Sequence, residues 1–207
     1  MSYSRTLSER IYSSTRPEYG ALRWQAARRH ILLHDRHGVD AIASFLVERP
    51  PTCAEIEIMS SAGDESASRL ASYAGPAAEI VCLPQPQIFD ALAFRLASAE
   101  TGIRLCVCGT QAFLSRVERT AFRCRFPREY FTGQVAGPSE WDIQCAYCKT
   151  IYPDVTHRIA RCDVCEVDLL VRNHYSIAYG AYQAVFVSPE DSMFLEARQS
   201  ELVQDGR

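Results

Sequence analysis

The residues best suited to chemistry are four cysteines arranged as two Cys-x-x-Cys pairs, "CAYC" at 145–148 and "CDVC" at 162–165. Thirteen residues separate the pairs, and Pro153-Asp154 between them can turn a hairpin. Tetrahedral coordination by thiolates needs two short turns that each present two sulfurs, and a hairpin brings such turns face to face. The spacing therefore predicts a metal site whose ligands are Cys145, Cys148, Cys162 and Cys165.

The identity of the metal depends on the residue that follows each pair. Zinc would make the site structural and closed, whereas iron in a rubredoxin-like site would carry electrons. Rubredoxin-type turns usually place glycine there, where the backbone becomes left-handed, but this chain has Lys149 and Glu166. A side chain in that conformation costs only about 1 kcal/mol, so the turns can still form. We favour zinc and keep iron as the alternative.

Length, composition and charge exclude several classes of protein. The chain has 207 residues, 47% of them hydrophobic, which suffices for one medium domain and a small module. A net charge of −3 provides no basic face for nucleic acid. No apolar run approaches the ~20 residues of a membrane helix, and no secretory signal is visible, so we expect a cytoplasmic protein without membrane partners. The cysteines outside the quartet are expected to behave as small hydrophobes: Cys53, Cys82, Cys106, Cys108 and Cys124.

The elements that must carry this site follow a regular alternation along the chain. Apolar runs predict strands over 29–35, 54–60, 78–84 and 103–109, each followed by helical periodicity over 38–50, 63–75, 87–102 and 110–122. Successive strand–helix units predict a three-layer α/β domain with a parallel sheet. We divide the chain into a polar leader (1–24), this α/β domain (25–125), a Pro- and Gly-rich linker (126–140), the four-cysteine module (141–195) and a tail (196–207).

The four-cysteine module resembles a known family. Its matching features are "CAYCKT" (145–150), the second cysteine pair, "LLVRNHYS" (169–176) and "GAYQAVFVSPED" (180–191). Together they are similar to the C-terminal region of the dimethylamine monooxygenase subunit DmmA family. The sequence departs from the family pattern at Glu166, at Ile177-Ala178 and at Ala184.

This resemblance implies a subunit of a multi-component, NADPH-dependent and heme-dependent oxidative N-demethylase. The implied partners are a heme-binding oxygenase subunit and ferredoxin–flavin reductase subunits, while this chain itself would bind neither heme nor flavin. The resemblance assigns the four cysteines as metal ligands. It also implies second-shell or partner-binding residues in the run after them: Arg172, His174, Tyr175 and Ser176.

A second resemblance concerns the α/β domain. The segment "LCVCGTQAFLSRV" (105–117) is similar to the end of the nucleotide-binding lobe of ferredoxin reductases, which implies a Rossmann-like sheet. However, the first strand–helix turn, "HDRHG" (34–38), lacks the Gly-x-Gly-x-x-Gly that admits a pyrophosphate. We expect a lobe that kept its packing and lost its ligand. The alternative is residual binding of a nucleotide or folate-like ligand, for which the candidate residues are His34, Asp35, Gly38, Cys108, Gly109 and Thr110.

These observations leave three hypotheses for function. The first is a non-catalytic subunit in which a Rossmann-like scaffold carries a zinc-ribbon or rubredoxin-like module that docks the partner subunits. The second is a rubredoxin-like one-electron carrier. The third is a folate- or formaldehyde-handling subunit, which would need an open ligand site in the α/β domain.

Overall fold

A computed structural model describes residues 17–50, 55–98 and 101–188. Contacts divide the described chain into two units. The first comprises Glu18–Trp141 together with Ile177–Gly180, and the second comprises Asp142–Ser176 together with the residues from Ala181 onward.

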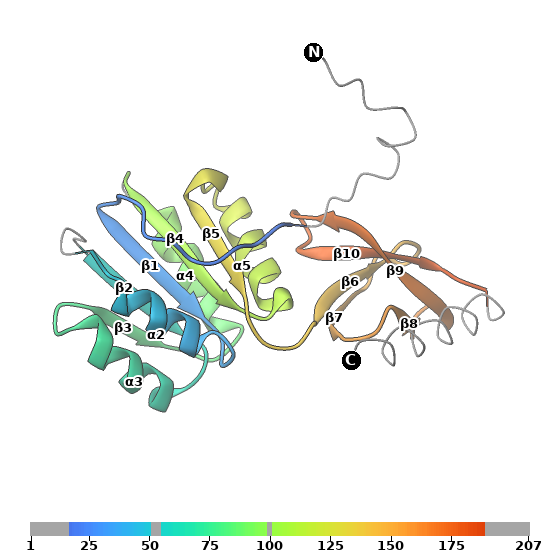
Figure 1. Ribbon diagram of the computed structural model, residues 1–207. Coiled ribbons are helices and arrows are strands. Elements are labelled where there is room, and N and C mark those ends of the chain that lie inside the picture. The colour runs from blue at the N-terminus through green and yellow to red at the C-terminus, as the bar shows by residue number, and fades with distance from the viewer. Residues whose placement is uncertain (1–16, 51–54, 99–100, 189–207) are drawn as a thin grey trace, which may run out of the picture. The chain divides into compact units, whose positions relative to one another are not determined.

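The first unit is built on a parallel sheet with the strand order β3-β2-β1-β4-β5 (Figure 1). The strands are β1 (Arg29–His34), β2 (Glu55–Ser60), β3 (Glu79–Cys82), β4 (Ile103–Gly109) and β5 (Phe131–Val135). The helices are α2 (Val39–Val47), α3 (Asp64–Ala74), α4 (Gln87–Ala97) and α5 (Gln111–Arg123), with a 3-10 turn, η1 (Arg128–Tyr130), before β5. The predicted α/β class and parallel sheet are confirmed.

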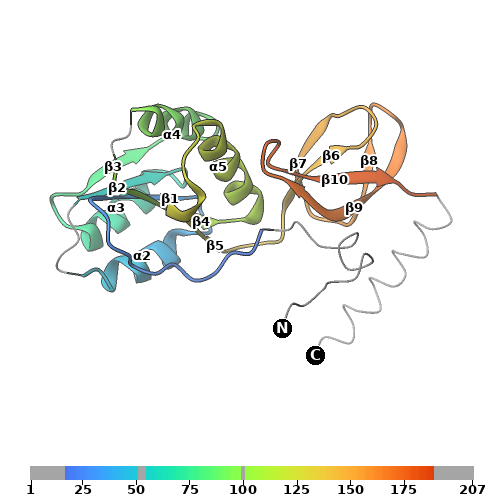
Figure 2. The same ribbon diagram turned by 90° about the horizontal axis from the view of Figure 1, so that it is seen from above.

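Helices cover both faces of this sheet, with α2 and α3 on one side and α4 and α5 on the other (Figure 2). The pleat directs alternate residues of the central strands into two cores. Leu32 and Cys106 pack with α2 and α3, whereas Ile31 and Leu105 pack with α4 and α5. Cys106 and its neighbour Cys108 are buried in the first of these cores as small hydrophobes, as predicted. Of the remaining thiols outside the quartet, Cys82 and Cys124 are half-buried, and Cys53 lies outside the described residues.

The linker predicted over 126–140 needs correction, because β5 lies inside it and pairs in parallel with β4. The glycines of this segment predict a linker between domains, but Gly133 is a glycine because of packing. A Cβ at Gly133 would stand 2.7 Å from Cδ1 of Tyr19 and 2.9 Å from Cδ2 of Leu114. The α/β unit therefore extends beyond residue 125 by one more strand.

The leader predicted over 1–24 also needs correction for its last residues. The Gly20 amide donates to the Gly133 carbonyl at 3.1 Å, and the Leu22 amide donates to Oε1 of Gln134 at 2.9 Å. Leu22 is buried, and the Trp24 ring stacks on Phe45 with centroids 4.0 Å apart. This segment packs along β5 and α2 as part of the unit, and residues 1–16 lie outside the described part of the chain.

The second unit is a mixed sheet with the order β7-β6-β10-β9-β8. Its strands are β6 (Trp141–Cys145), β7 (Ile151–Val155), β8 (Ile159–Cys162), β9 (Val167–Ser176) and β10 (Ala181–Phe186). Strand β9 runs antiparallel to β8 and β10, and β10 runs parallel to β6. The predicted tail over 196–207 lies outside the described residues.

The core of this second sheet is small. Ile143, Leu169 and Ala184 are fully buried, and the rings of Tyr175 and Tyr182 pack together with centroids 5.1 Å apart. The sequence left open whether the tyrosine-rich run forms a core or a partner-binding face, and these two rings belong to the core. With few large side chains buried among the described residues of this unit, the sheet would gain from a further source of stability.

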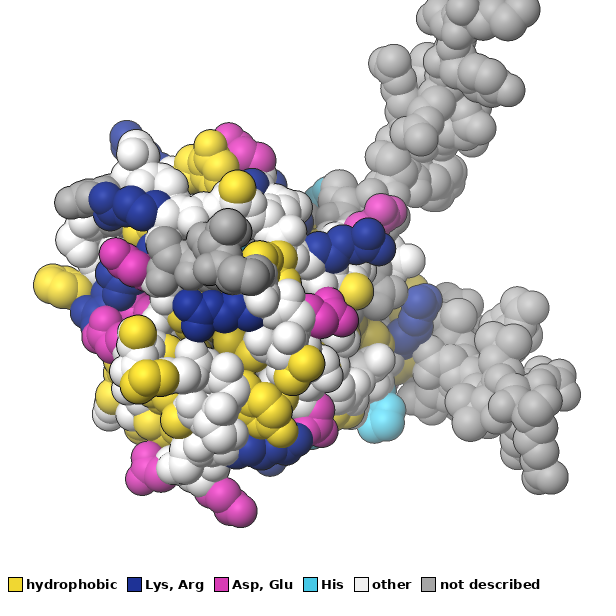
Figure 3. All heavy atoms as spheres, turned by 60° about the vertical axis from the view of Figure 1, so that its left-hand side comes forward, with side chains coloured by type: hydrophobic (Ala, Val, Ile, Leu, Met, Phe, Trp, Pro, Cys, Tyr) yellow, Lys and Arg dark blue, Asp and Glu magenta, His cyan; other side chains and the backbone are white. Residues whose placement is uncertain are grey.

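Two further observations concern binding to nucleic acid and insertion into a membrane. On the face seen in Figure 3, Lys and Arg side chains are interspersed with Asp and Glu side chains. Within residues 17–50, 55–98 and 101–188, no helix is both long enough and apolar enough to cross a membrane.

Candidate metal centre

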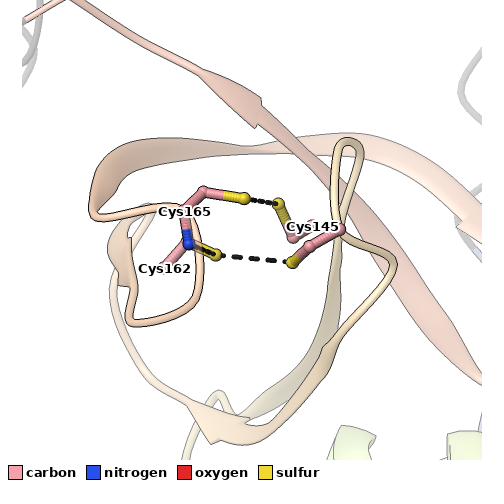
Figure 4. A group of neighbouring side chains, drawn as sticks. Cys145, Cys162 and Cys165 are labelled. Carbon is pink, nitrogen blue, oxygen red and sulfur yellow. Dashed lines mark hydrogen bonds between the residues drawn. The ribbon is translucent and has the colours of Figure 1, made fainter.

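The sulfurs of the cysteine quartet gather in one cluster, in which each Sγ lies within 4.8 Å of the others. The Sγ atoms of Cys145 and Cys165 are 4.0 Å apart (Figure 4). Those of Cys148 and Cys162 are 3.6 Å apart. A disulfide would require about 2.05 Å, so these are separate thiols. Four sulfurs at about 2.3 Å from a tetrahedral metal are about 3.8 Å from one another. The observed distances fit a metal ion at the centre.

Two similar turns position these sulfurs. Cys145 ends β6 and Cys162 ends β8, so each pair begins where a strand stops. Lys149 donates its amide to the Cys145 carbonyl at 3.1 Å, and Glu166 donates its amide to the Cys162 carbonyl at 2.7 Å. Both closing residues are left-handed, with φ of 65° at Lys149 and 57° at Glu166. The left-handed turns expected from the spacing form without glycine.

Two hydroxyl groups contact sulfurs of the quartet, and neither was predicted. The Thr150 hydroxyl lies 3.3 Å from Sγ of Cys148, and the Tyr152 hydroxyl lies 3.3 Å from Sγ of Cys162. The Tyr152 oxygen also accepts the Asp163 amide at 3.0 Å, which leaves its own proton for the sulfur. Tyr152 thus joins β7 to the second cysteine turn. The sequence could have indicated the Thr150 contact, because Thr150 lies two residues after Cys148. It offers no comparable signal for the contact of Tyr152 with Cys162.

The thiols of the quartet have divergent proton affinities. The hydroxyl and amide of Thr150 lower the pKa of Cys148 to about 6 by stabilising the thiolate. Desolvation, followed by the hydrogen-bonded neighbouring sulfurs, raises the pKa of Cys165 to about 12. Four negative sulfurs at these distances repel one another unless a cation lies between them. The cluster is therefore a set of donors that a divalent metal ion would complete.

The sequence-predicted residues at the ends of β1 and β4 also come together in the structure. His34 ends β1 and Gly38 caps α2, while Cys108 and Gly109 end β4 and Thr110 caps α5. Burial lowers the pKa of His34, and its Nε2 has no hydrogen-bond partner within the described residues. Burial, and then the Asp35 charge, raises the pKa of Cys108 to about 12, so this thiol stays protonated.

Comparisons with known proteins place both units. The model of the dimethylamine monooxygenase subunit DmmA-like N-terminal domain matches residues 11–128, and that of the DmmA-like C-terminal domain matches residues 142–185. The chain belongs to the DmmA-like family. The C-terminal match contains all four quartet cysteines, and the N-terminal match extends the resemblance to the α/β unit, where the sequence motifs gave little support.

A solved structure also resembles part of the chain. It is the siderophore-interacting protein SipS from Aeromonas hydrophila, with 13% identity, a TM-score of 0.35, and coverage of 54% of this chain and 51% of that one. The chain thus spans about half the length of that protein. A comparison with curated proteins finds no match. Membership of the DmmA-like family supports the interpretation that the chain is a subunit of a dimethylamine monooxygenase. A subunit implies partner chains.

The residues that the DmmA-like resemblance assigned outside the quartet lie on β9. Arg172 and His174 are exposed, Ser176 is half-buried, and Tyr175 is buried against Tyr182. Within the described residues, the side-chain hydroxyls that contact the sulfurs come from Thr150 and Tyr152 instead. A partner-binding role for the exposed residues of β9 remains a prediction.

Proposed function

We propose that the chain is a non-catalytic, non-heme subunit of a heme-dependent, NADPH-dependent oxidative N-demethylase, and that its four-cysteine module is a zinc ribbon that docks the partner subunits. The observation that carries this proposal is the four-sulfur cluster within a unit matched by the DmmA-like C-terminal model. Four protein ligands complete a tetrahedral zinc ion and leave no position for water or substrate. Such a site stabilises a fold and performs no reaction of its own.

The zinc ion would supply the stability that the small core lacks. It would tie the turn after β6 to the turn after β8, which thirteen residues of chain separate. Closing this loop restricts the unfolded chain, and structural zinc couples its binding free energy to folding. The proposal therefore makes the metal a condition for the folded module.

The docking surface is proposed at the two cysteine turns. Tyr147 in the first turn is 62% exposed and Val164 in the second is 64% exposed. Each stands at the third position of its Cys-x-x-Cys pair, so the turn that holds the metal presents one large apolar side chain to solvent. Apolar side chains on a rigid support are suited to the centre of a protein interface. The partners implied by the family are the heme-binding and reductase subunits.

Elemental analysis and co-purification test this proposal. We expect about one zinc per purified chain. The double variant Tyr147→Ser and Val164→Ser should retain the zinc and lose co-elution with the partner subunits, because a contact area is removed and no ligand is changed. Val47→Ser, at a 70% exposed position of α2, is the control and should co-elute normally. Unchanged co-elution of the double variant would refute the docking surface.

Iron remains the alternative because the sulfur cluster suits both metals. Hydrogen bonds to thiolate ligands, such as those from Thr150 and Tyr152, tune the reduction potential of an iron site. A rubredoxin-like carrier would be purified with iron, absorb visible light and show a reversible one-electron couple. One zinc and no iron in the chain isolated from its native host would exclude this alternative.

The Tyr152 hydroxyl should strengthen metal retention. We expect Tyr152→Phe to release zinc to a chelator about tenfold faster than the wild-type chain, since loss of an outer-shell partner typically weakens metal affinity about 10- to 100-fold. The measurement is the rate of zinc transfer to a chromogenic chelator. Tyr147→Phe removes a hydroxyl from an exposed ring in the same unit and should leave the rate unchanged. Equal rates for both variants would show that the hydroxyl bond to Cys162 does not hold the metal.

A further inference from the structure

The order of the first sheet reverses between β1 and β4. In open α/β sheets, ligands bind in the crevice at the carboxyl ends of the two strands where the order reverses. Here the helices that follow these strands, α2 and α5, lie on opposite faces of the sheet (Figure 2). Their amino-terminal ends, which carry partial positive charge, therefore meet at this point.

An anion already stands between these helix ends, and it belongs to the chain. Oδ1 of Asp35 accepts the amides of His37 at 2.8 Å and Gly38 at 3.1 Å, and Oδ2 accepts the amide of Thr110 at 2.8 Å. Gly38 caps α2 and Thr110 caps α5, so one carboxylate binds the amino-terminal ends of both helices. The Asp35 residue is only 6% exposed.

The surrounding backbone is shaped to this carboxylate. A Cβ at Gly109 would lie 2.6 Å from Cγ of Asp35, so the carboxylate rests directly on the bare Cα of the glycine. A Cβ at Gly38 would lie 2.1 Å from the carbonyl oxygen of Cys108, so the loop after β1 lies directly on the end of β4. Protein atoms thus fill the place where a nucleotide pyrophosphate approaches the backbone in ligand-binding sheets of this kind.

We propose that the Asp35 carboxylate is a built-in substitute for a ligand phosphate, and that the α/β unit is consequently a closed scaffold that binds neither NADPH nor a folate-like ligand. A phosphate would have to take the same three amides and displace a charge of its own sign. With Asp35 removed, these amides and the two helix ends form a cradle for a small oxyanion such as inorganic pyrophosphate. This inference is independent of the metal and of the docking surface.

The test follows the melting temperature of the full chain with and without NADPH or inorganic pyrophosphate. The wild-type chain should respond to neither. Asp35→Ala should melt about 5 to 10 °C lower, because the His37 and Thr110 amides lose their acceptor and the Gly38 amide keeps only the main-chain carbonyl of residue 35. Added pyrophosphate should then restore much of this loss in a saturable manner, since it can fill the vacated cradle. Asp90→Ala, at an exposed position of α4, is the control and should behave as the wild type.

Two results would overturn the inference. One is saturable stabilisation of the wild-type chain by NADPH or pyrophosphate, which would show that Asp35 leaves the crevice open. The other is an Asp35→Ala chain that folds and ignores pyrophosphate, which would show that no anion cradle lies beneath the carboxylate. Should Asp35→Ala fail to fold, Asp35→Ser must show the response instead, because its hydroxyl keeps one acceptor and leaves room for the anion.

Discussion

Cys162→Ser should abolish metal binding and unfold the second unit while the α/β unit stays folded. Cys162 is fully buried, and its Sγ also receives the Cys165 amide at 3.3 Å and the Tyr152 hydroxyl. Serine offers a poor ligand in place of a thiolate, and structural zinc contributes roughly 10 to 16 kcal/mol to the folding of small zinc-dependent units. A sheet with so small a core does not survive that loss.

The measurements are zinc content and amide hydrogen exchange of the full chain. Protection should disappear in β6 to β10 and persist in β1 and β4, whose cores are separate from the second sheet. Cys124→Ser makes the same chemical change at a half-buried thiol outside the quartet and should keep both zinc and protection. A Cys162→Ser chain with full zinc content would refute the assignment of the ligands.

The features that the sequence predicted are those with local causes. Strand and helix positions follow from the hydrophobic period, and β4 matches its predicted range of 103–109. The clustering of the four cysteines follows from a spacing that fixes two turns, which the left-handed Lys149 and Glu166 complete. The resemblance to the DmmA-like family also follows from local sequence, because its motifs, "CAYCKT" and "LLVRNHYS", lie within the segment that the C-terminal family model matches.

The features that the sequence could not predict depend on partners distant along the chain. The sequence predicts a linker where β5 lies, because Gly133 is explained by the side chains of Tyr19 and Leu114 that pack on it, and both are distant along the chain. Tyr152 contacts Cys162 only because β7 lies beside the second cysteine turn. Asp35 was identified as a candidate ligand-binding residue, but no local pattern shows that its carboxylate turns inward to the Thr110 amide.

Gly38→Ala should destabilise the α/β unit by about 3 kcal/mol, at the upper end of the cost of overpacking. The backbone of Gly38 has φ of −85° and ψ of −8°, which any residue can adopt, so the cost is purely steric. The added methyl would stand 2.1 Å from the Cys108 carbonyl oxygen. That carbonyl cannot move away freely, because β4 is paired with β1 on one side and β5 on the other.

Urea unfolding of the full chain, followed by tryptophan fluorescence, measures this effect, because Trp24 stacks on Phe45 of α2. Gly20→Ala is the matched control, since no atom lies within 4 Å of a Cβ built there, and its stability should change by less than about 1 kcal/mol. Equal stability of the two variants would mean that the loop after β1 can lift off β4. The same loop carries the His37 and Gly38 amides that Asp35 binds, so that result would also count against the proposed closure of the crevice.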